Sequence, residues 1–221
     1  MNPGRPDFNL CLITDRLSLP PGRDLLQTVE QALIGGVGAV QLREKDLSAA
    51  ELFELALPLR ALTRRHGARL LINDRIDVAL AVDADGVHLG HGSLPATRAR
   101  VLLGPQKLIG VSIHQLDQIP LAPRDGADFI TFSPVYFTPS KAPYGAPQGI
   151  ERLQSACRAS AIPVFALGGI RLEHLDEVRA AGANGIALIS AIFAADDPAS
   201  AARTLVNALN IRGFPASRSS L

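Results

Sequence analysis

Short apolar segments alternate with helical segments along nearly the whole chain, and this alternation restricts the possible folds more than any other feature. Eight segments of four or five residues have the character of strands, and most are apolar throughout rather than at every second position. A strand that is apolar on both faces is typical of a parallel sheet covered by helices. We expect strands at residues 10–14, 39–43, 69–73, 86–89, 108–112, 129–133, 163–167 and 185–188.

Seven of the intervening segments have the pattern of helices. Asp24 and Ser48 stand where two of these helices should begin, and their side chains can accept the first unpaired backbone N–H groups. Gly67 and Gly104 directly follow helical segments, where glycine commonly ends a helix. We expect helices at residues 25–33, 48–66, 76–82, 96–103, 150–158, 172–180 and 199–209.

About eight strand–helix units in 221 residues predict one domain, an α/β fold of the (β/α)8 TIM-barrel type over residues 1–211. The alternative is an open doubly wound sheet, which usually has a GxGxxG turn after its first strand, and no such turn follows here. Residues 212–221 are polar and are expected to form a flexible C-terminal tail. In a barrel the active site lies at the carboxyl ends of the strands, whereas the Gly- and Asp-containing turns before the strands serve stability.

Composition restricts the ligands and the compartment. Lys and Arg number 22 and Asp and Glu 21, so a net charge of +1 predicts no nucleic-acid or membrane partner, and any anion must be bound locally. No apolar run reaches the ~18–20 residues of a membrane helix, and we expect no signal peptide. Cys11 and Cys157 match neither a metal pair nor a disulfide framework, which predicts a cytoplasmic protein.

Polar side chains gather at the end of the second predicted strand, in the sequence QLREK at residues 41–45. Because side chains alternate along an extended strand, Gln41, Arg43 and Lys45 should point to one side and Glu44 to the other. An arginine binds two phosphate oxygens with its planar guanidinium, and a lysine adds a point charge. The group suits a phosphate or diphosphate, and the alternative is surface charge without a ligand.

The third predicted strand ends in Asn73 and Asp74. An amide and a carboxylate at the mouth of a barrel can hold a phosphate oxygen and a Mg²⁺ ion, since Mg²⁺ often takes one or two carboxylates and completes its coordination with phosphates and water. The alternative is that these residues cap the helix that begins directly after them.

The connection after the sixth strand, at residues 133–149, is long for a compact domain, and loops of this length usually have a function. Thr138, Ser140 and Lys141 lie close together in this loop. Two hydroxyl groups with a lysine can form a flexible clamp or lid over an anion. The loop therefore extends the predicted cationic site around the second and third strands.

A second anion site is predicted on the other side of the mouth. Gly168 and Gly169 follow the seventh strand, and Ser190 follows the eighth at the start of a candidate short helix. Backbone N–H groups and a helix start at these positions bind phosphate in many barrels. Two separate anion sites predict a ligand with two phosphorylated ends, or two phosphorylated substrates.

Seven motifs of the chain together resemble the thiamine phosphate synthase/TenI family. They cover nearly the whole chain in order: QLREKD, LLINDR, DGVHLG, IGVSIH, FSPVYFTPSK, ALGGI and ANGIALISAI. The resemblance implies a TIM-barrel transferase of thiamine biosynthesis that joins hydroxymethylpyrimidine diphosphate to a thiazole phosphate and releases diphosphate. It implies a dissociative reaction in which Mg²⁺ and cations draw off the diphosphate and the thiazole nitrogen captures the pyrimidine-methyl carbocation.

The resemblance also implies a role for each matching residue. Arg43, Lys45, Lys141 and Ser112 would be catalytic, with Ser112 near the pyrimidine and the leaving group. Asp74 would be a Mg²⁺ ligand. A homo-oligomer is compatible with the family, and the expected partners are the two small phosphorylated substrates. The substrate-binding residues would be Gln41 and Asn73 at the diphosphate, Thr138 and Ser140 at the thiazole, and Gly169, Ile189 and Ser190 at the thiazole phosphate.

Two positions depart from the synthase pattern. Ser93 stands where synthases have the aspartate that serves as the second Mg²⁺ ligand, and Gly92-Ser93 resembles the TenI branch, whose known members are thiazole tautomerases. Those tautomerases have a histidine just after the sixth strand, where this chain has Pro134. A complete diphosphate-binding set favours the synthase. The alternatives are a thiazole tautomerase that uses His91 or His114, or a non-catalytic relative that binds phosphate ligands.

Overall fold

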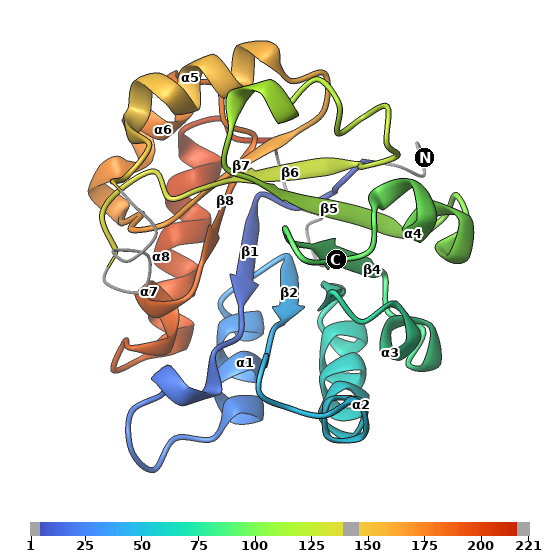
Figure 1. The fold of residues 1–221 in the computed structure, drawn as a ribbon. Coiled ribbons are helices and arrows are strands. Elements are labelled where there is room, and N and C mark those ends of the chain that lie inside the picture. The colour runs from blue at the N-terminus through green and yellow to red at the C-terminus, as the bar shows by residue number, and fades with distance from the viewer. Residues whose placement is uncertain (1–4, 139–145, 216–221) are drawn as a thin grey trace.

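The computed structural model describes residues 5–138 and 146–215, and in it eight parallel strands close into a barrel (Figure 1). Each strand pairs with the next along the chain, and the last pairs with the first, where Cys11 lies opposite Ala187. The predicted single-domain (β/α)8 barrel is confirmed. The strands are β1 (Leu10–Ile13), β2 (Ala39–Leu42), β3 (Arg69–Asn73), β4 (Gly86–Leu89), β5 (Leu108–Ile113), β6 (Phe129–Phe132), β7 (Val164–Leu167) and β8 (Gly185–Leu188).

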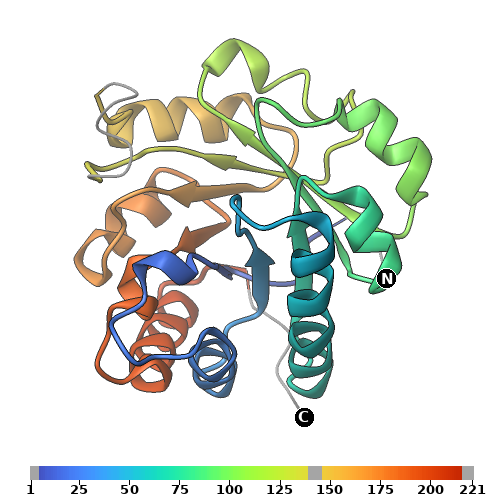
Figure 2. The same ribbon diagram turned by 60° about the horizontal axis from the view of Figure 1, so that its bottom comes forward.

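Helices surround the strands on the outside of the barrel (Figure 2). Asp24 accepts a hydrogen bond from the Gln27 N–H, and Ser48 forms a reciprocal cap with Glu51, so both predicted helix starts are confirmed. No helix in the described ranges is long and apolar enough to cross a membrane. The α-helices are α1 (Leu25–Ile34), α2 (Ala49–Arg65), α3 (Ile76–Ala81), α4 (Ala96–Leu103), α5 (Gly149–Ala159), α6 (Leu175–Ala180), α7 (Ser190–Phe193) and α8 (Pro198–Ile211).

Two connections differ from a regular strand–helix repeat. Between β5 and β6 the chain forms the 3-10 helix η2 (Leu116–Gln118) and turns, with no α-helix in residues 114–128. The helix predicted at 172–180 consists of the 3-10 helix η4 (Leu172–His174) followed by α6. A further 3-10 helix, η1 (Arg16–Ser18), follows β1.

Aromatic rings fill the lower part of the barrel interior. Phe8 lies 5.8 Å from Phe129 and 5.2 Å from Phe165, measured between ring centroids. A Cβ atom at Gly110 would lie 2.4 Å from Phe129 and 2.6 Å from His88, so a glycine is needed there to leave room for the two rings. The interior below the mouth is therefore occupied by side chains, as is usual for these barrels.

The turns that precede several strands fasten each strand to its neighbour. Asp85, directly before β4, accepts a hydrogen bond of 2.8 Å from the N–H of Leu70 in β3. In the same way, Asp128 before β6 accepts a hydrogen bond of 2.8 Å from the N–H of Ile109 in β5. Asn184 before β8 accepts one of 3.0 Å from the N–H of Val164 in β7. These contacts explain why similar Gly- and Asp-containing turns recur in the sequence, and they support the stability role predicted for this face.

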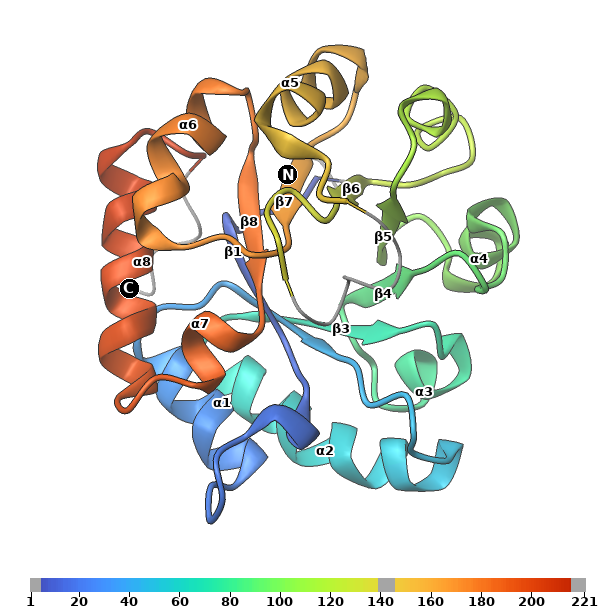
Figure 3. The ribbon, with the colours of Figure 1, turned by 60° about the vertical axis from the view of Figure 1, so that its left-hand side comes forward.

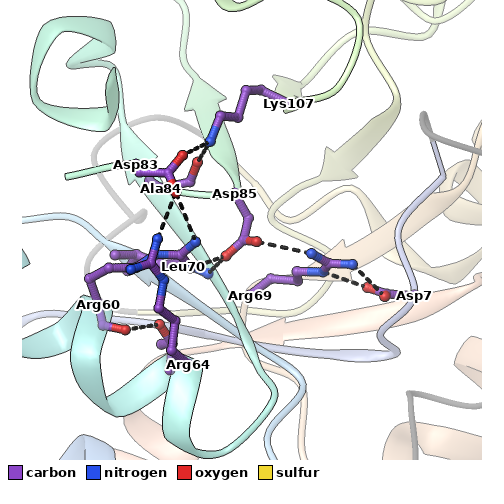
Figure 4. A network of polar contacts seen from close by, with 10 residues as sticks. Asp7, Arg60, Arg64, Arg69, Leu70, Asp83, Ala84, Asp85 and Lys107 are labelled. Atoms are coloured by element: carbon purple, nitrogen blue, oxygen red, sulfur yellow. Dashed lines mark hydrogen bonds and ion pairs between the residues drawn. The ribbon is translucent and has the colours of Figure 1, made fainter. Parts of the chain in front are cut away.

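Ion pairs link the N-terminal ends of neighbouring strands (Figure 4). Arg69 lies between Asp7, at 2.8 Å, and Asp85, at 2.9 Å, and these hydrogen bonds raise the pKa of its guanidinium. Arg60 also binds Asp85, at 2.5 Å. Arg64 and Lys107 both bind Asp83, so each of these four cations is paired with a carboxylate.

The packed chain continues beyond residue 211, where the sequence predicts a flexible tail to begin. Arg212 binds Asp176 through two hydrogen bonds of 2.7 and 3.0 Å. Phe214 is 3 % exposed, and Arg179 donates to the carbonyl of Gly213. The boundary at 211 is thus too early, because an aromatic side chain after α8 packs into the core. Residues 216–221 lie outside the described ranges.

Candidate active site

The chain after β2 turns at Lys45 and Asp46, where the N–H of Leu47 donates to the carbonyl of Glu44 at 3.4 Å, so the strand alternation predicted for Gln41, Arg43 and Lys45 does not extend to Lys45. The N–H of Arg43 donates to the hydroxyl of Thr14 at 2.9 Å, and the N–H of Thr14 donates to the carbonyl of Gln41 at 2.9 Å. Gln41 is buried in β2, Arg43 is half-buried and Lys45 is exposed. The two segments that follow β1 and β2 therefore hold each other at the mouth of the barrel.

Arg16 of η1 engages the two acidic residues of this segment. Glu44 is buried and accepts hydrogen bonds from the Arg16 N–H at 3.1 Å and from its guanidinium at 3.4 Å. Asp46 binds the same guanidinium through contacts of 2.6 and 2.7 Å, which lower the pKa of its carboxyl. Both acids are thus engaged by Arg16.

Arg43 and Lys45, the other two cations of this segment, are not engaged by these acids. Within the described residues, neither of them forms an ion pair, because Arg16 occupies the acids on either side. This arrangement contrasts with the N-terminal face, where the cations of the network in Figure 4 are all paired with carboxylates. The carboxyl-end mouth is thus the end of the barrel that can attract an anion.

Asn73 and Asp74 lie beside these cations. Leu42 of β2 is level with Ile72 of β3, so Arg43 and Asn73 end neighbouring strands at the same height. The alternative that Asn73 or Asp74 caps α3 is wrong, because Arg75 is the cap residue and no side chain bonds the helix start.

Asp74 ends β3 in an unusual backbone conformation. Its φ of +64° lies in the left-handed region, which non-glycine residues seldom adopt and which is often found at functional sites. Its N–H donates to the carbonyl of His88 at 2.9 Å, and its side chain is exposed.

Asp74 is a carboxylate at the mouth that could hold Mg²⁺. The described parts of the chain contain no group of three His, Cys, Asp or Glu side chains that could enclose a metal. Ser93 has no carboxylate, and its hydroxyl accepts a hydrogen bond of 2.7 Å from the N–H of Gly90 within the turn after β4. A single exposed carboxylate fits Mg²⁺ when phosphate oxygens and water supply the other ligands.

A chain of polar groups crosses the barrel interior below the mouth. The hydroxyl of Thr131 in β6 lies 3.3 Å from Nε2 of His88 in β4 and 3.5 Å from the hydroxyl of Ser112 in β5. Burial, and to a lesser extent the nearby cation of Arg43, lower the pKa of His88 to about 3. His88 is therefore a neutral core side chain, and Ser112 is the half-buried member of this chain nearest to solvent.

The histidines that the sequence places near the mouth occupy three different environments. His88 lies within β4 and is buried, whereas His91 is exposed in the turn that follows. Nδ1 of His114 lies 2.7 Å from the carbonyl of Ser133, and Gln148 donates to the carbonyl of His114 at 3.1 Å. The ring of His114 is thus tied to the end of β6.

The segment after β6 runs along the end of β7. The N–H of Val135 donates to the carbonyl of Leu167 at 2.9 Å, and the N–H of Tyr136 donates to Gly168 at 3.0 Å. This pairing carries the chain toward Thr138, which is half-buried. The predicted anion-binding residues Ser140 and Lys141 lie outside the described ranges.

Gly169 is required by a close approach of two backbone segments. Its φ is +65°, and a Cβ atom there would lie 2.5 Å from the carbonyl oxygen of Phe137 and 2.9 Å from Cβ of Tyr136. On the next strand, Ile189 is the cap residue of α7, and Ser190 is its exposed first residue. N–H groups at the start of a helix have no partner within it. The structure thus brings the ends of β7 and β8 together beside α7 (Figure 3).

A family model, curated relatives and a solved structure of 36% identity point to the same family. A family model described as thiamine monophosphate synthase matches residues 10–192. A putative thiamine-phosphate synthase of Geobacter sulfurreducens is 60% identical over 200 residues, which cover 90% of this chain and 93% of that protein. The thiamine-phosphate synthase of Chloroflexus aurantiacus is 46% identical over 199 residues, covering 90% and 91%. The solved structure of a thiamine phosphate pyrophosphorylase from Pyrococcus furiosus has a TM-score of 0.85 and 36% identity, covering 95% of this chain and 98% of that one.

Proposed function

The chain belongs to the thiamine monophosphate synthase family, and we propose that it is the transferase that joins hydroxymethylpyrimidine diphosphate to a thiazole phosphate with release of diphosphate. The observation that carries this proposal is that Arg43 and Lys45, at the mouth of the barrel, form no ion pair with the described residues. A leaving diphosphate is the group in this reaction that such cations would stabilise most.

The diphosphate half of the reaction is assigned to the ends of β2 and β3. The bond between the pyrimidine methylene carbon and the diphosphate oxygen breaks, and the electron pair leaves with the diphosphate. The guanidinium of Arg43 can bind two of its oxygens, and Lys45 adds charge as the bond lengthens. Bound Mg²⁺, held by Asp74, would neutralise further negative charge on the diphosphate. Gln41, Asn73 and Lys141 complete this proposed set, with Ser112 near the pyrimidine.

The thiazole half is assigned to the ends of β6, β7 and β8. The ring nitrogen of the thiazole donates its electron pair to the pyrimidine methylene carbon, and a C–N bond forms. No side-chain nucleophile is needed, so the protein contributes position and charge. We assign the thiazole to Thr138 and Ser140, and its phosphate to backbone and hydroxyl groups of Gly169, Ile189 and Ser190.

The residue at position 93 favours testing a second activity, that of a thiazole tautomerase. Ser93 supplies no second carboxylate, and its hydroxyl is engaged with Gly90. A thiazole tautomerase needs no metal-bound diphosphate, and the exposed His91 would then move the proton. The unpaired Arg43 and Lys45 favour the synthase, because a tautomerase binds a single phosphate.

The test is product analysis with the wild-type protein, both substrates and Mg²⁺. A synthase forms thiamine phosphate and diphosphate in equal amounts. A tautomerase instead isomerises the thiazole carboxylate phosphate without Mg²⁺. Binding of both substrates without any product would identify a non-catalytic relative and would contradict the proposal.

A cytoplasmic location is part of the proposal. The support for it is the state of the two cysteines, which form no disulfide. Burial raises the pKa of Cys11 and of Cys157 to about 12, so neither thiol is poised to react. The expected partners are the two phosphorylated substrates, and a homo-oligomer stays a prediction.

A further inference from the structure

Tyr136 joins the segment after β6 to the helical turn that follows β7. Its ring stacks on His174 of η4 with 3.9 Å between ring centroids and 14° between the planes. Its hydroxyl donates a hydrogen bond of 2.6 Å to Glu177 of α6, and burial, followed by this hydrogen bond, raises the pKa of the phenol. Two elements that are far apart in the sequence are thus fastened by one side chain.

The backbone of Tyr136 lies against the proposed thiazole-phosphate site. Its N–H donates to the carbonyl of Gly168 at 3.0 Å. Its Cβ atom is 2.9 Å from the position that a Cβ at Gly169 would occupy. A shift of Tyr136 would therefore move the backbone at Gly169, and it would also move Thr138, which follows two residues later.

The diphosphate half of the site has no such connection to Tyr136. Arg43 and Asn73 are placed by β2 and β3 and by the hydroxyl of Thr14. These strands lie across the barrel from β6 and β7 in the closed order of strands. Loss of the Tyr136 contacts should consequently affect one half of the mouth and leave the other in place.

We propose that Tyr136, through its hydrogen bond to Glu177 and its stacking on His174, is a positioning residue that sets the affinity of the site for the thiazole phosphate. This proposal rests on the proposed function, because it names the half-site that the contact serves. Tyr136 acts through the Gly168–Gly169 backbone and Thr138, and does not itself touch the substrate.

The fold does not depend on the hydroxyl of Tyr136. The bond to Glu177 lies at the exposed surface, and the neighbouring Val135 is buried and pairs with Leu167 independently. Tyr136→Phe keeps the ring on His174 and removes only the hydrogen bond. The melting temperature of this variant should stay close to that of the wild type.

The experiment measures the affinity for each substrate in Tyr136→Phe, Glu177→Ala and the double variant. Calorimetric titration with thiazole phosphate should show a loss of about three- to tenfold in each single variant, the effect of one partly exposed hydrogen bond. The double variant should lose no more than either single variant, because both remove the same contact. The KM for pyrimidine diphosphate should be unchanged. Glu173→Ala, on η4 but outside the contact, is the matched control and should bind as the wild type does.

Equal losses for both substrates, or additive losses in the double variant, would overturn the proposal in favour of a general structural role. Unchanged thiazole phosphate affinity in all three variants would also overturn it. The titration needs no turnover. A wild-type protein that binds thiazole phosphate but makes no thiamine phosphate would therefore contradict the proposed function. The inference about Tyr136 would still be decided by the affinities of the variants for thiazole phosphate.

Discussion

His88 should make the protein sensitive to acid well before its carboxylates are protonated. The imidazole is fully buried in the barrel interior beside Phe129, and its pKa is lowered to about 3 from an ordinary value of 6.5. The unfolded chain takes up a proton on this side chain below pH 6.5, whereas the folded protein does not do so until near pH 3. The contribution of His88 to stability is therefore complete above pH 6.5 and is lost as the pH falls toward 3.

The size of the effect follows from the displacement of the pKa. Each pH unit between the two pKa values lowers the free energy of unfolding by about 1.4 kcal/mol. Between pH 6.5 and pH 4.5 the loss from this one residue should be about 2.3 kcal/mol, a large part of the stability of an ordinary domain. Desolvation is the main cause, the cation of Arg43 adds to it, and no carboxylate partner opposes either effect.

The assay is urea unfolding of the wild type and of His88→Gln at pH 7 and pH 4.5. Glutamine stays neutral at both pH values and can still reach Thr131. Between pH 7 and pH 4.5 the free energy of unfolding should therefore fall about 3 kcal/mol less in the variant than in the wild type. His91→Gln alters an exposed histidine and should keep the wild-type pH dependence. Parallel pH profiles for the wild type and His88→Gln would refute the reasoning.

Two further predictions concern ligand binding at the mouth. Arg43→Ala should weaken binding of inorganic diphosphate at least about tenfold by calorimetry, because a charge-assisted bidentate contact is lost. The control is Arg124→Ala, which removes an exposed arginine in the β5–β6 connection and should leave the affinity for diphosphate unchanged. Equal affinity in the two variants would contradict the proposed cationic site. Ser93→Asp should lower the Mg²⁺ concentration needed for half-maximal turnover, because it adds a second carboxylate near Asp74. An unchanged Mg²⁺ requirement would place the metal away from the β4 turn.

Much of the fold follows from local sequence patterns. β3, β4 and β8 have the bounds predicted from the sequence, because each contains a short apolar run next to a polar residue or a glycine. The caps Asp24 and Ser48 are also local features, recognisable from one side chain and the next three residues. The missing helix between β5 and β6 agrees with the sequence there, since residues 114–128 contain two prolines and a glycine and show no helical period.

Contacts between distant segments could not be predicted from local sequence patterns. Arg16 forms ion pairs with both Glu44 and Asp46, yet nothing in the sequence before or after Arg16 marks these partners. His88 is placed near the mouth by its position in the chain, but the direction of its side chain depends on the closure of the barrel and on Gly110. The polar residues at the strand ends were predictable because parallel strands bring their carboxyl ends to one edge.

The central claim is that the mouth of the barrel holds two anions on opposite sides. The most direct measurement is a crystal structure of the wild-type protein with diphosphate, Mg²⁺ and thiazole phosphate. We expect diphosphate against Arg43 and Asn73 with Mg²⁺ at Asp74, and a separate phosphate at the N–H groups of Gly169 and Ser190. One shared anion site, or anions bound only at the N-terminal face near Arg69, would contradict the account.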